Sequence, residues 1–320
     1  MLPYHGTMLA PMRTLTQGPF WEILNHYGPP DAYVSEFVRV HENFTIDEGW
    51  IEESLLSAGS CPLWIQLMGN DESALARNVE LLQRYPIEGI DLNVGCPAPK
   101  IFKKQAGGGL LKDLTLLNRL VRTLRQCCQR PLSVKIRLGF DGTDAFDQVL
   151  DILRENMVDL VTIHARTVQD RYSGAVRYEF IQHAAEKMPM PVVANGDIDS
   201  LECIRRVLDF THCHGIMIGR GAVRNPWIFA QWRNLISNKS VFQPCFQDIF
   251  AYLQDLYRVF NLQSTPIALG RMKQFCCYIF TGSEHRAFLK QILTCDKIVD
   301  FWFLCEKRLI QGDCTQKLWY

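Results

Sequence analysis

Eight short apolar segments, each followed by a stretch long enough to form a helix, succeed one another through the first 222 residues of this 320-residue chain. The segments comprise residues 7–12, 32–35, 63–69, 89–95, 132–139, 160–166, 191–197 and 215–221. Near-continuous apolar runs of this kind are typical of parallel strands that are covered on both faces. Eight strand-then-helix units in series predict an α/β fold of the (β/α)8 TIM-barrel type. The alternative, an open doubly wound sheet, usually has fewer strands.

The stretches between these segments have the periodicity of amphipathic helices. Residues 73–85, for example, place apolar side chains on one face and follow Asp71, a residue type that is favoured at helix N-caps. The strand pattern then stops, whereas helical periodicity continues from residue 243 to the end of the chain. We therefore predict a barrel domain over residues 1–240 and a small C-terminal all-α domain over residues 241–320.

Polar side chains are unusually frequent at the predicted carboxyl ends of the strands. In TIM barrels these strand ends, with the loops that follow them, form the active site. One polar strand end would be ordinary, but six of the eight ends carry such groups on otherwise apolar strands, namely Gln66, Asn93, Lys135 with Arg137, His164 with Arg166, Asn195 with Asp197, and Arg220. The sequence therefore predicts a ring of polar groups around one ligand.

Each of these residues also has a purely structural interpretation. Gln66 can be a buried amide that bonds to the backbone, and His164 can be a core histidine with satisfied hydrogen bonds. The tripeptide at 195–197 can be an ordinary turn. Lys135 is harder to explain in this way, because it lies between apolar residues and its ammonium group would be costly to bury without an anionic partner. The ligand interpretation requires fewer coincidences.

A glycine-flanked arginine, Gly219-Arg220-Gly221, follows the eighth predicted strand. Glycines let backbone N–H groups approach an anion, and the loops after strands seven and eight are the common phosphate site of TIM barrels. Arg220 would add a charge-assisted donor. No G-x-G-x-x-G motif opens a βαβ unit, so a dinucleotide bound in the Rossmann manner is not indicated. We expect a ligand that carries phosphate.

A cysteine follows the fourth predicted strand, in the segment Asn93-Val94-Gly95-Cys96-Pro97. A free thiol has a pKa of about 8.5 and is mostly protonated near neutral pH. Cys96 can therefore donate a proton without special tuning, whereas a nucleophilic role would need a neighbouring base. The basic loop that follows ends in three glycines, 107–109, which can form the hinge of a loop that closes over substrate. The alternative for Cys96 is a small buried side chain.

The charge of the chain is balanced overall and uneven locally. Thirty-four Lys and Arg offset 34 Asp and Glu, so the net charge of zero excludes a uniformly basic nucleic-acid binder. Residues 1–96 carry 4 basic and 13 acidic side chains, whereas residues 97–137 carry 10 basic and 1 acidic side chain. The basic part includes the loop beside Cys96, where a local field can attract a polyanion.

The cysteines and the N-terminus restrict the class of protein further. The 12 cysteines include no C-x-x-C pair, and the His212-Cys213-His214 patch lacks a spaced second pair of ligands. We therefore expect neither a disulfide scaffold nor a metal site. The N-terminal residues lack the pattern of a signal peptide, and no apolar stretch reaches the roughly 20 residues of a membrane span. We expect a soluble, cytoplasmic protein without a membrane partner, and a monomer.

Taken together, these motifs resemble the tRNA-dihydrouridine synthases, a family of FMN-dependent enzymes that reduce uridine in tRNA. The resemblance rests on Ala10-Pro11-Met12, Gln66, the Asn-x-Gly-Cys-Pro segment at 93–97 with its downstream glycines, and residues 135–137, 164–166, 195–197 and 219–221. It extends over nearly the whole chain, because the helical tail fits the RNA-recognition domain of the family. Within the tail, Arg271-Met272-Lys273-Gln274 resembles the bacterial C-type subgroup, which is associated with uridine at tRNA position 16.

The resemblance implies a role for each site residue. FMN would be held in the barrel domain by Pro11, Met12, Gln66, Lys135, His164, Asn195, Gly196, Asp197, Gly219 and Arg220. The uracil would be positioned by Asn93 and Arg137, and the tRNA would also be contacted by Arg271, Lys273 and Gln274. Reduced FMN would deliver hydride to C6 of the uracil while Cys96, as general acid, protonates C5. NADPH would re-reduce the flavin, and the target base would have to leave its stack.

Two alternatives stay open at this point. One keeps the flavin barrel but changes the substrate to a small pyrimidine-like molecule, as in the dihydroorotate dehydrogenases, which do not need a helical domain carrying Arg271 and Lys273. The other is a flavin-free RNA-binding protein. The chain also departs from the family pattern at Arg13-Thr14, where a glycine usually follows Ala10-Pro11-Met12 within two residues, and the role of Arg13 is therefore open.

Overall fold

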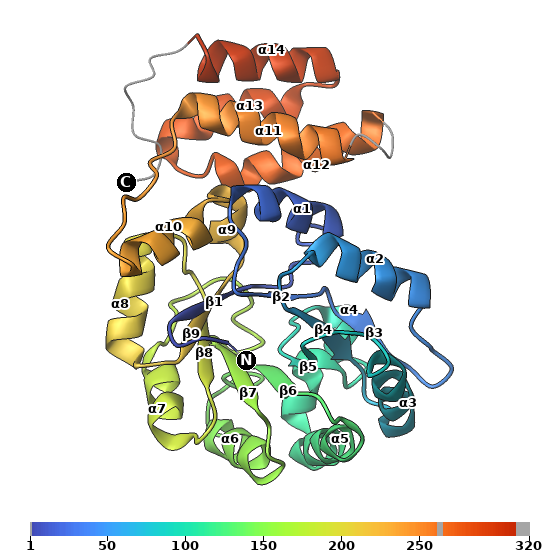
Figure 1. Ribbon diagram of the computed structural model, residues 1–320. Coiled ribbons are helices and arrows are strands. Elements are labelled where there is room, and N and C mark those ends of the chain that lie inside the picture. Colours follow the sequence, from blue (N-terminus) through green and yellow to red (C-terminus); the bar gives the residue numbers. More distant parts are fainter. Residues whose placement is uncertain (1, 261–264, 312–320) are drawn as a thin grey trace. The chain divides into compact units, whose positions relative to one another are not determined.

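The structure, a computed structural model, describes residues 2–260 and 265–311 (Figure 1). The chain divides into two compact units. The first unit comprises residues 1–18 and 29–219, and the second comprises residues 19–28 and 220–320. Residues 19–28 and 220–240, which the sequence-based division assigned to the barrel domain, thus group with the helical unit.

Eight parallel strands of the described residues form a closed barrel in the first unit. Their order around the barrel is β2-β1-β9-β8-β7-β6-β5-β4, and pairing of β2 with β4 closes the ring. The strands are β1 (Gly6–Leu9), β2 (Ala32–Val34), β4 (Leu63–Met68), β5 (Gly89–Val94), β6 (Leu132–Arg137), β7 (Leu160–His164), β8 (Val192–Asn195) and β9 (Gly215–Ile218). All eight predicted strands are confirmed. The short β3 (Val38–Arg39), which adds to β4, was missed because two residues produce no apolar run.

Helices alternate with the barrel strands and surround them in Figure 1. They are α2 (Glu48–Ala58), α3 (Glu72–Leu82), α5 (Leu114–Cys127), α6 (Phe146–Glu155), α7 (Glu179–Lys187) and α8 (Leu201–Thr211). The short α4 (Pro99–Phe102) and the 3-10 helix η1 (Gly107–Lys112) follow β5. The Asp71 cap predicted for α3 is confirmed, since its carboxylate accepts a hydrogen bond of 2.7 Å from the Ala74 N–H.

The interior of the barrel contains an apolar cluster. It draws buried side chains from strands around the whole ring, with Leu2 added from the N-terminal segment: Leu2, Met8, Ala10, Ala32, Val34, Trp64, Leu160, Val193 and Met217. Burial of apolar surface on this scale is the main source of folding stability. This apolar cluster holds together the strands whose carboxyl ends carry the predicted site residues.

The second unit consists of helices. They are α1 (Gly18–Tyr27), α9 (Arg220–Arg224), α10 (Ile228–Ile236), α11 (Phe246–Phe260), α12 (Thr265–Ile279), η2 (Ser283–His285), α13 (Arg286–Thr294) and α14 (Ile298–Leu309). Helix α1 joins this unit through Phe20, which stacks on Phe275 with ring centroids 5.7 Å apart, and through Tyr27, whose hydroxyl donates to Asp255 at 2.8 Å. The predicted C-terminal helical region is confirmed.

In the parts of the chain that the structure describes, no helix combines the length and the apolar character that crossing a membrane requires.

Candidate active site

The side chains that face the barrel interior change from apolar to polar toward the carboxyl ends of the strands. Pairing aligns Gln66 of β4 with Asp91 of β5, and Asp91 with Ser133 of β6. One step further, Asn93 of β5 is aligned with Lys135 of β6. Because side chains of a strand alternate between its two faces, Asp91 and Asn93 share the inward face. The predicted ring of polar groups therefore forms on adjacent strands.

A buried carboxylate lies at the base of this ring. Asp91 accepts a hydrogen bond of 2.7 Å from Gln66 Nε2 on one oxygen and a short hydrogen bond from the Ser133 hydroxyl on the other. Burial raises the pKa of Asp91 from 3.8 to about 6, against the opposing effect of these two hydrogen bonds and of the nearby Lys135 charge. At neutral pH the carboxyl group is therefore mainly ionised and accepts hydrogen bonds only.

Asn93 connects this carboxylate network to the predicted general acid. Its Nδ2 donates to Gln66 Oε1 at 2.8 Å. Its Oδ1 accepts from the backbone N–H groups of Gly95 at 3.1 Å and Cys96 at 2.9 Å. The Asn-x-Gly-Cys pattern therefore places the amide of Asn93 under the backbone that carries the thiol, so that the backbone of Cys96 is tied to the barrel interior.

Two of the three predicted hinge glycines pack directly on Cys96. A Cβ at Gly107, whose φ is +55°, would lie 2.9 Å from the Cβ of Cys96. The Gly108 N–H donates to the Cys96 carbonyl at 3.1 Å, and a Cβ at Gly108 would lie 2.9 Å from the same oxygen. Side chains at these positions would displace the thiol, which explains why glycine is needed there. Movement of this loop as a hinge stays a prediction.

The thiol of Cys96 is partly buried, and burial raises its pKa above the usual 9.0. Three cations, Arg137, Arg13 and Lys135, act in the opposite direction without cancelling the effect of burial. Cys96 is therefore protonated at neutral pH, as a general acid must be. Arg13, whose role the sequence left open, is thus one of the cations that lower the pKa of the Cys96 thiol.

Lys135 places a positive charge at the carboxyl end of β6. Its Nζ donates to Asn195 Oδ1 at 3.0 Å, and no carboxylate of the described residues lies within ion-pair distance of it. Burial, together with the nearby Arg137 charge, lowers the pKa of Lys135 from 10.5 to about 8, against the opposing effect of the Asp91 charge. Asn195 is held in turn, because its Nδ2 donates to the Met217 carbonyl at 2.8 Å. A cation arranged in this way is complementary to an electron-rich ligand.

Arg137 points from the end of β6 toward the loop that follows β7. Its guanidinium donates to the carbonyls of Thr167 at 2.7 Å and Arg171 at 2.6 Å. It also lies 5.4 Å from the centroid of the Tyr172 ring. The side chain of Tyr172 is exposed. Arg137 thus presents a fixed, delocalised cation next to an accessible aromatic ring.

The ends of β7 and β8 bring together His164 and the tripeptide 195–197. His164 and Asn195 are neighbours across the two strands, and both are buried. Gly196 has a φ of +125°, a conformation that favours glycine, and its carbonyl accepts from the Tyr178 hydroxyl at 2.6 Å. The carboxylate of Asp197 is paired with Arg166 through two hydrogen bonds, one of 3.0 Å. Asp197 therefore orients a buried arginine.

The loop after β1 accounts for the departure from the family pattern. Thr14 adopts a φ of +67°, the left-handed region in which glycine is favoured. The Thr16 hydroxyl closes the turn, accepting from the Met12 N–H at 2.7 Å and donating to the Ala10 carbonyl at 3.1 Å. Pro11 and Met12 are partly buried beside this turn. A Cβ at Gly219 would lie 3.1 Å from the Met12 sulfur, so the ends of β1 and β9 approach closely.

The other predicted residues lie in the helical unit. Arg220 is the first residue of α9. Arg271, Lys273 and Gln274 lie on α12, where all three are partly exposed. The guanidinium of Arg271 is 5.4 Å from the centroid of the Phe260 ring.

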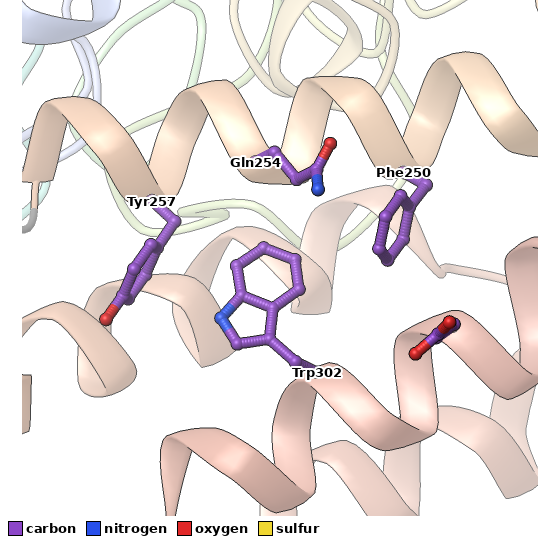
Figure 2. A pocket seen from close by; sticks show the side chains of 5 residues that line it. Phe250, Gln254, Tyr257 and Trp302 are labelled. Carbon is purple, nitrogen blue, oxygen red and sulfur yellow. The ribbon is translucent and has the colours of Figure 1, made fainter.

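A shallow pocket of about 410 Å³ lies between α11 and α14 of the helical unit. In Figure 2, the ring of Trp302 lies between Phe250 and Tyr257, with centroids 5.8 and 5.4 Å away. Glu306 and Gln254 complete the lining, which contains no basic side chain. None of the predicted site residues lines it. Across residues 2–260 and 265–311, no group of three or more His, Cys, Asp or Glu side chains could hold a metal ion.

The sequence prediction missed two residues of the barrel site and left a third without a role. Asp91 and Ser133 were absorbed into strands that had been identified by their apolar neighbours. The period of two shared by Asp91 and Asn93 was the signal that could have identified the first of them. Arg166 belonged to a motif but received no role, because its pairing with Asp197 depends on the contact between the ends of β7 and β8.

Comparisons with known proteins identify the family of the chain. The family model described as Dihydrouridine synthase (Dus) matches residues 8–293. The chain is 31% identical over 267 residues to tRNA-dihydrouridine synthase B of Pasteurella multocida, covering 80% of this chain and 78% of that protein. It is 30% identical over 276 residues to tRNA-dihydrouridine(16) synthase of Pseudomonas putida, covering 83% and 85%.

Solved structures show a likeness of fold alone. The old yellow enzyme homologue from Zymomonas mobilis superimposes with a TM-score of 0.54 at 11% identity, covering 75% of this chain and 92% of that one. The family match spans most of the chain, and the Asn-x-Gly-Cys-Pro segment, Lys135 and His164 all lie within it. The chain therefore belongs to the dihydrouridine synthase family.

Proposed function

We propose that this protein is an FMN-dependent tRNA-dihydrouridine synthase that reduces the C5–C6 bond of a uridine in the tRNA D-loop, at position 16. Its family membership makes it an oxidoreductase. The observation that carries the proposal is the placement of Cys96, whose backbone N–H donates to Asn93 Oδ1 at 2.9 Å beside the polar barrel interior. We also propose that the protein acts in the cytoplasm as a monomer, with NADPH as the reductant.

The residues at the carboxyl ends of the strands fit a flavin mononucleotide. Lys135 is a cation with no carboxylate at ion-pair distance in the described part of the chain, so it suits a ring that gains negative charge on reduction. Gln66 presents a second polar side chain on the same inward surface. When bound, reduced FMN supplies the hydride that adds to C6 of the uracil. We assign Lys135 and Gln66 to the isoalloxazine, and Pro11 and Met12 to packing against it.

The phosphate end of FMN is assigned to the loops after β7, β8 and β9. His164 and Asn195 are buried neighbours at two of these strand ends. The positive φ of Gly196 and the close packing of Gly219 bring backbone near the predicted site. In this proposal Asp197 acts by orienting Arg166, and Arg220 supplies a further cation.

The substrate uracil is assigned to Asn93, Arg137 and Cys96. Arg137 is fixed by two backbone carbonyls and therefore offers an oriented donor surface without rearrangement. Cys96 delivers its proton to C5 of the uracil, and its S–H bond breaks as the C5–H bond forms. The cations that face Cys96 stabilise the thiolate left by this step.

The tRNA itself is assigned to both domains, with the helical domain as the recognition module. Arg271, Lys273 and Gln274 of α12 would contact the RNA outside the target base. Two of the relatives carry names that differ in type, one B and one 16. The assignment to position 16 therefore rests on the 271–274 segment.

Mapping dihydrouridine in tRNA from cells that lack the protein tests the proposal most directly. We expect the modification to disappear at position 16 and to return with the wild-type gene but not with Cys96→Ala. Loss at a different D-loop position would retain the enzyme class and overturn the position. Purified protein without visible flavin absorbance, and without uptake of added FMN, would favour an RNA-binding protein instead. Reduction of free pyrimidines in place of tRNA would favour the small-molecule alternative.

A further inference from the structure

Asp91 is a buried carboxylate that none of the proposed steps uses. Its side chain is 2% exposed and lies inside the barrel, between Gln66 on β4 and Ser133 on β6. Burying a charged group is unfavourable unless its partners repay the lost hydration. The presence of a buried carboxylate at this position therefore requires an explanation, and its hydrogen bonds provide one.

The hydrogen bonds of Asp91 begin a series in which the order of donors and acceptors is fixed. An ionised carboxylate only accepts, so Gln66 must turn its NH₂ group toward Asp91, as it does at 2.7 Å. The carbonyl oxygen of Gln66 then faces Asn93, which must present its own NH₂ group, and the distance is 2.8 Å. The oxygen of Asn93 is thereby directed at the backbone beyond it.

At the other end of this series of hydrogen bonds, the backbone groups require the same donor-to-acceptor direction. The backbone N–H groups of Gly95 and Cys96 only donate, and both are directed at Asn93 Oδ1, at 3.1 and 2.9 Å. Every donor in the series thus meets an acceptor, from the Cys96 backbone to the Asp91 carboxylate. Gln66, Asp91 and Asn93 are all buried, so water does not substitute for a missing partner.

We propose that Asp91 is a positioning residue whose carboxylate is the terminal acceptor of a hydrogen-bonded relay, Asp91–Gln66–Asn93, that fixes the backbone of Cys96 and hence the location of its thiol. The consequence for catalysis rests on the proposed function. The positioning of Cys96 does not rest on the proposed function, because every hydrogen bond of the relay joins two groups of the protein itself.

Lys135 offers a competing explanation for Asp91, that of a counter-ion. Lys135 is the charged group that acts on the Asp91 carboxylate. However, both oxygens of Asp91 are taken by hydrogen bonds to Gln66 and Ser133, and the Lys135 ammonium group donates to Asn195. The two charges thus interact at a distance, whereas the relay is built from direct hydrogen bonds.

Amide hydrogen exchange of the flavin-free protein tests the relay without tRNA or cofactor. Asp91→Leu removes the terminal acceptor at similar volume, whereas Asp91→Asn keeps an acceptor oxygen that can still face Gln66. We expect exchange at the Gly95 and Cys96 amides to rise about three- to tenfold in Asp91→Leu, the effect of weakening one ordinary hydrogen bond. Asp91→Asn should retain wild-type exchange at both amides.

Two further variants separate the relay from general packing. Ser133→Ala removes a hydrogen bond to Asp91 that lies outside the relay, so exchange at Gly95 and Cys96 should not change. Gln66→Met breaks the relay one link further on and should reproduce the effect of Asp91→Leu. The rate at which iodoacetamide alkylates Cys96, measured peptide by peptide, should change in Asp91→Leu and Gln66→Met but not in Ser133→Ala. The exposed Cys277 serves as internal reference.

The proposal is overturned if folded Asp91→Leu leaves exchange at Gly95 and Cys96 unchanged, or if Ser133→Ala raises it as much. An equal rise in amide exchange at Gly95 and Cys96 in Asp91→Asn would also overturn the proposal, because this variant keeps the oxygen that accepts from Gln66. If Asp91→Leu does not fold, Gln66→Met decides the question by the same readout. Failure of the proposed function would instead appear as absent dihydrouridine formation by wild-type protein with normal exchange at both amides.

Discussion

The two ends of the barrel interior are built on the same strands but have opposite chemistry. On β4, the apolar Trp64 precedes the polar Gln66 by two residues, and on β8, Val193 precedes Asn195 in the same way. Both members of each pair face inward, because the period of a strand is two. On these strands the apolar end belongs to the interior cluster that stabilises the fold, while the carboxyl end holds polar groups.

The polar end carries a cost that the apolar end does not. Burial raises the pKa of Asp91 from 3.8 to about 6 and lowers that of Lys135 from 10.5 to about 8. Each shift means that the folded protein disfavours the charged form. For Asp91 the shift corresponds to about 3 kcal/mol. The buried charges at the polar end therefore lower the stability of the protein, whereas the apolar cluster raises it.

The largest expected effect concerns activity at the polar end. Cys96→Ala removes the proposed proton donor and should lower single-turnover formation of dihydrouridine by about 10²- to 10⁴-fold. Flavin binding and thermal stability should change little, because the thiol is only partly buried. The matched control is Cys277→Ala, which alters an exposed thiol of the helical unit. Turnover at the wild-type rate in Cys96→Ala would remove this residue from the mechanism.

The next effect concerns stability at the apolar end. Leu160→Ala truncates a buried side chain of the interior cluster, at the first residue of β7, and should lower the free energy of unfolding by about 2–5 kcal/mol in urea titrations. Flavin affinity of the folded variant should be retained, because Leu160 begins β7 whereas His164, the predicted site residue of this strand, ends it. Met157→Ala, at a side chain that is 70% exposed, serves as the control. A variant that keeps its stability but loses flavin would erase the distinction between the two ends.

A smaller effect of opposite sign is expected from Asp91→Asn. The folded pKa of about 6 lies above the ordinary 3.8, so the stability associated with Asp91 is present below pH 3.8 and is lost as the pH rises through 6. Removing the charge should therefore stabilise the protein by about 1–3 kcal/mol near pH 7 and have no effect near pH 4. Urea titrations of both proteins across this range measure the difference. Destabilisation at neutral pH would show that the carboxylate is stabilising, contrary to the comparison.

The smallest effect extends the comparison to the helical unit, where charges are partly exposed and carry little cost of burial. Replacing Arg271 and Lys273 by Ala should reduce the slope of log affinity against log salt for tRNA by about two, one unit for each lost phosphate contact. Turnover of bound tRNA should stay the same. Filter binding over a series of salt concentrations measures the slope, and an unchanged slope would remove α12 from the tRNA interface.

The barrel could be predicted because its strands are short apolar runs in a regular series with helices. The strand ends could be predicted because a polar side chain such as Lys135 or His164 is conspicuous after such a run. The relay could not, since its direction depends on which residue of β4 pairs with Asp91, a matter of register. The orientation of the Arg137 side chain could not be predicted from the sequence either, because its acceptors lie on a loop 30 or more residues further along the chain.

The backbone of Thr14 has a consequence for the evolvability of the first loop. A β-branched residue in the left-handed region is held there at a cost of about 1 kcal/mol or more, and only a well-packed turn retains it. Glycine could replace Thr14 without new strain, and asparagine would tolerate the conformation, whereas valine would distort the turn that ends at Thr16. The geometry of the loop therefore admits few residue types at position 14.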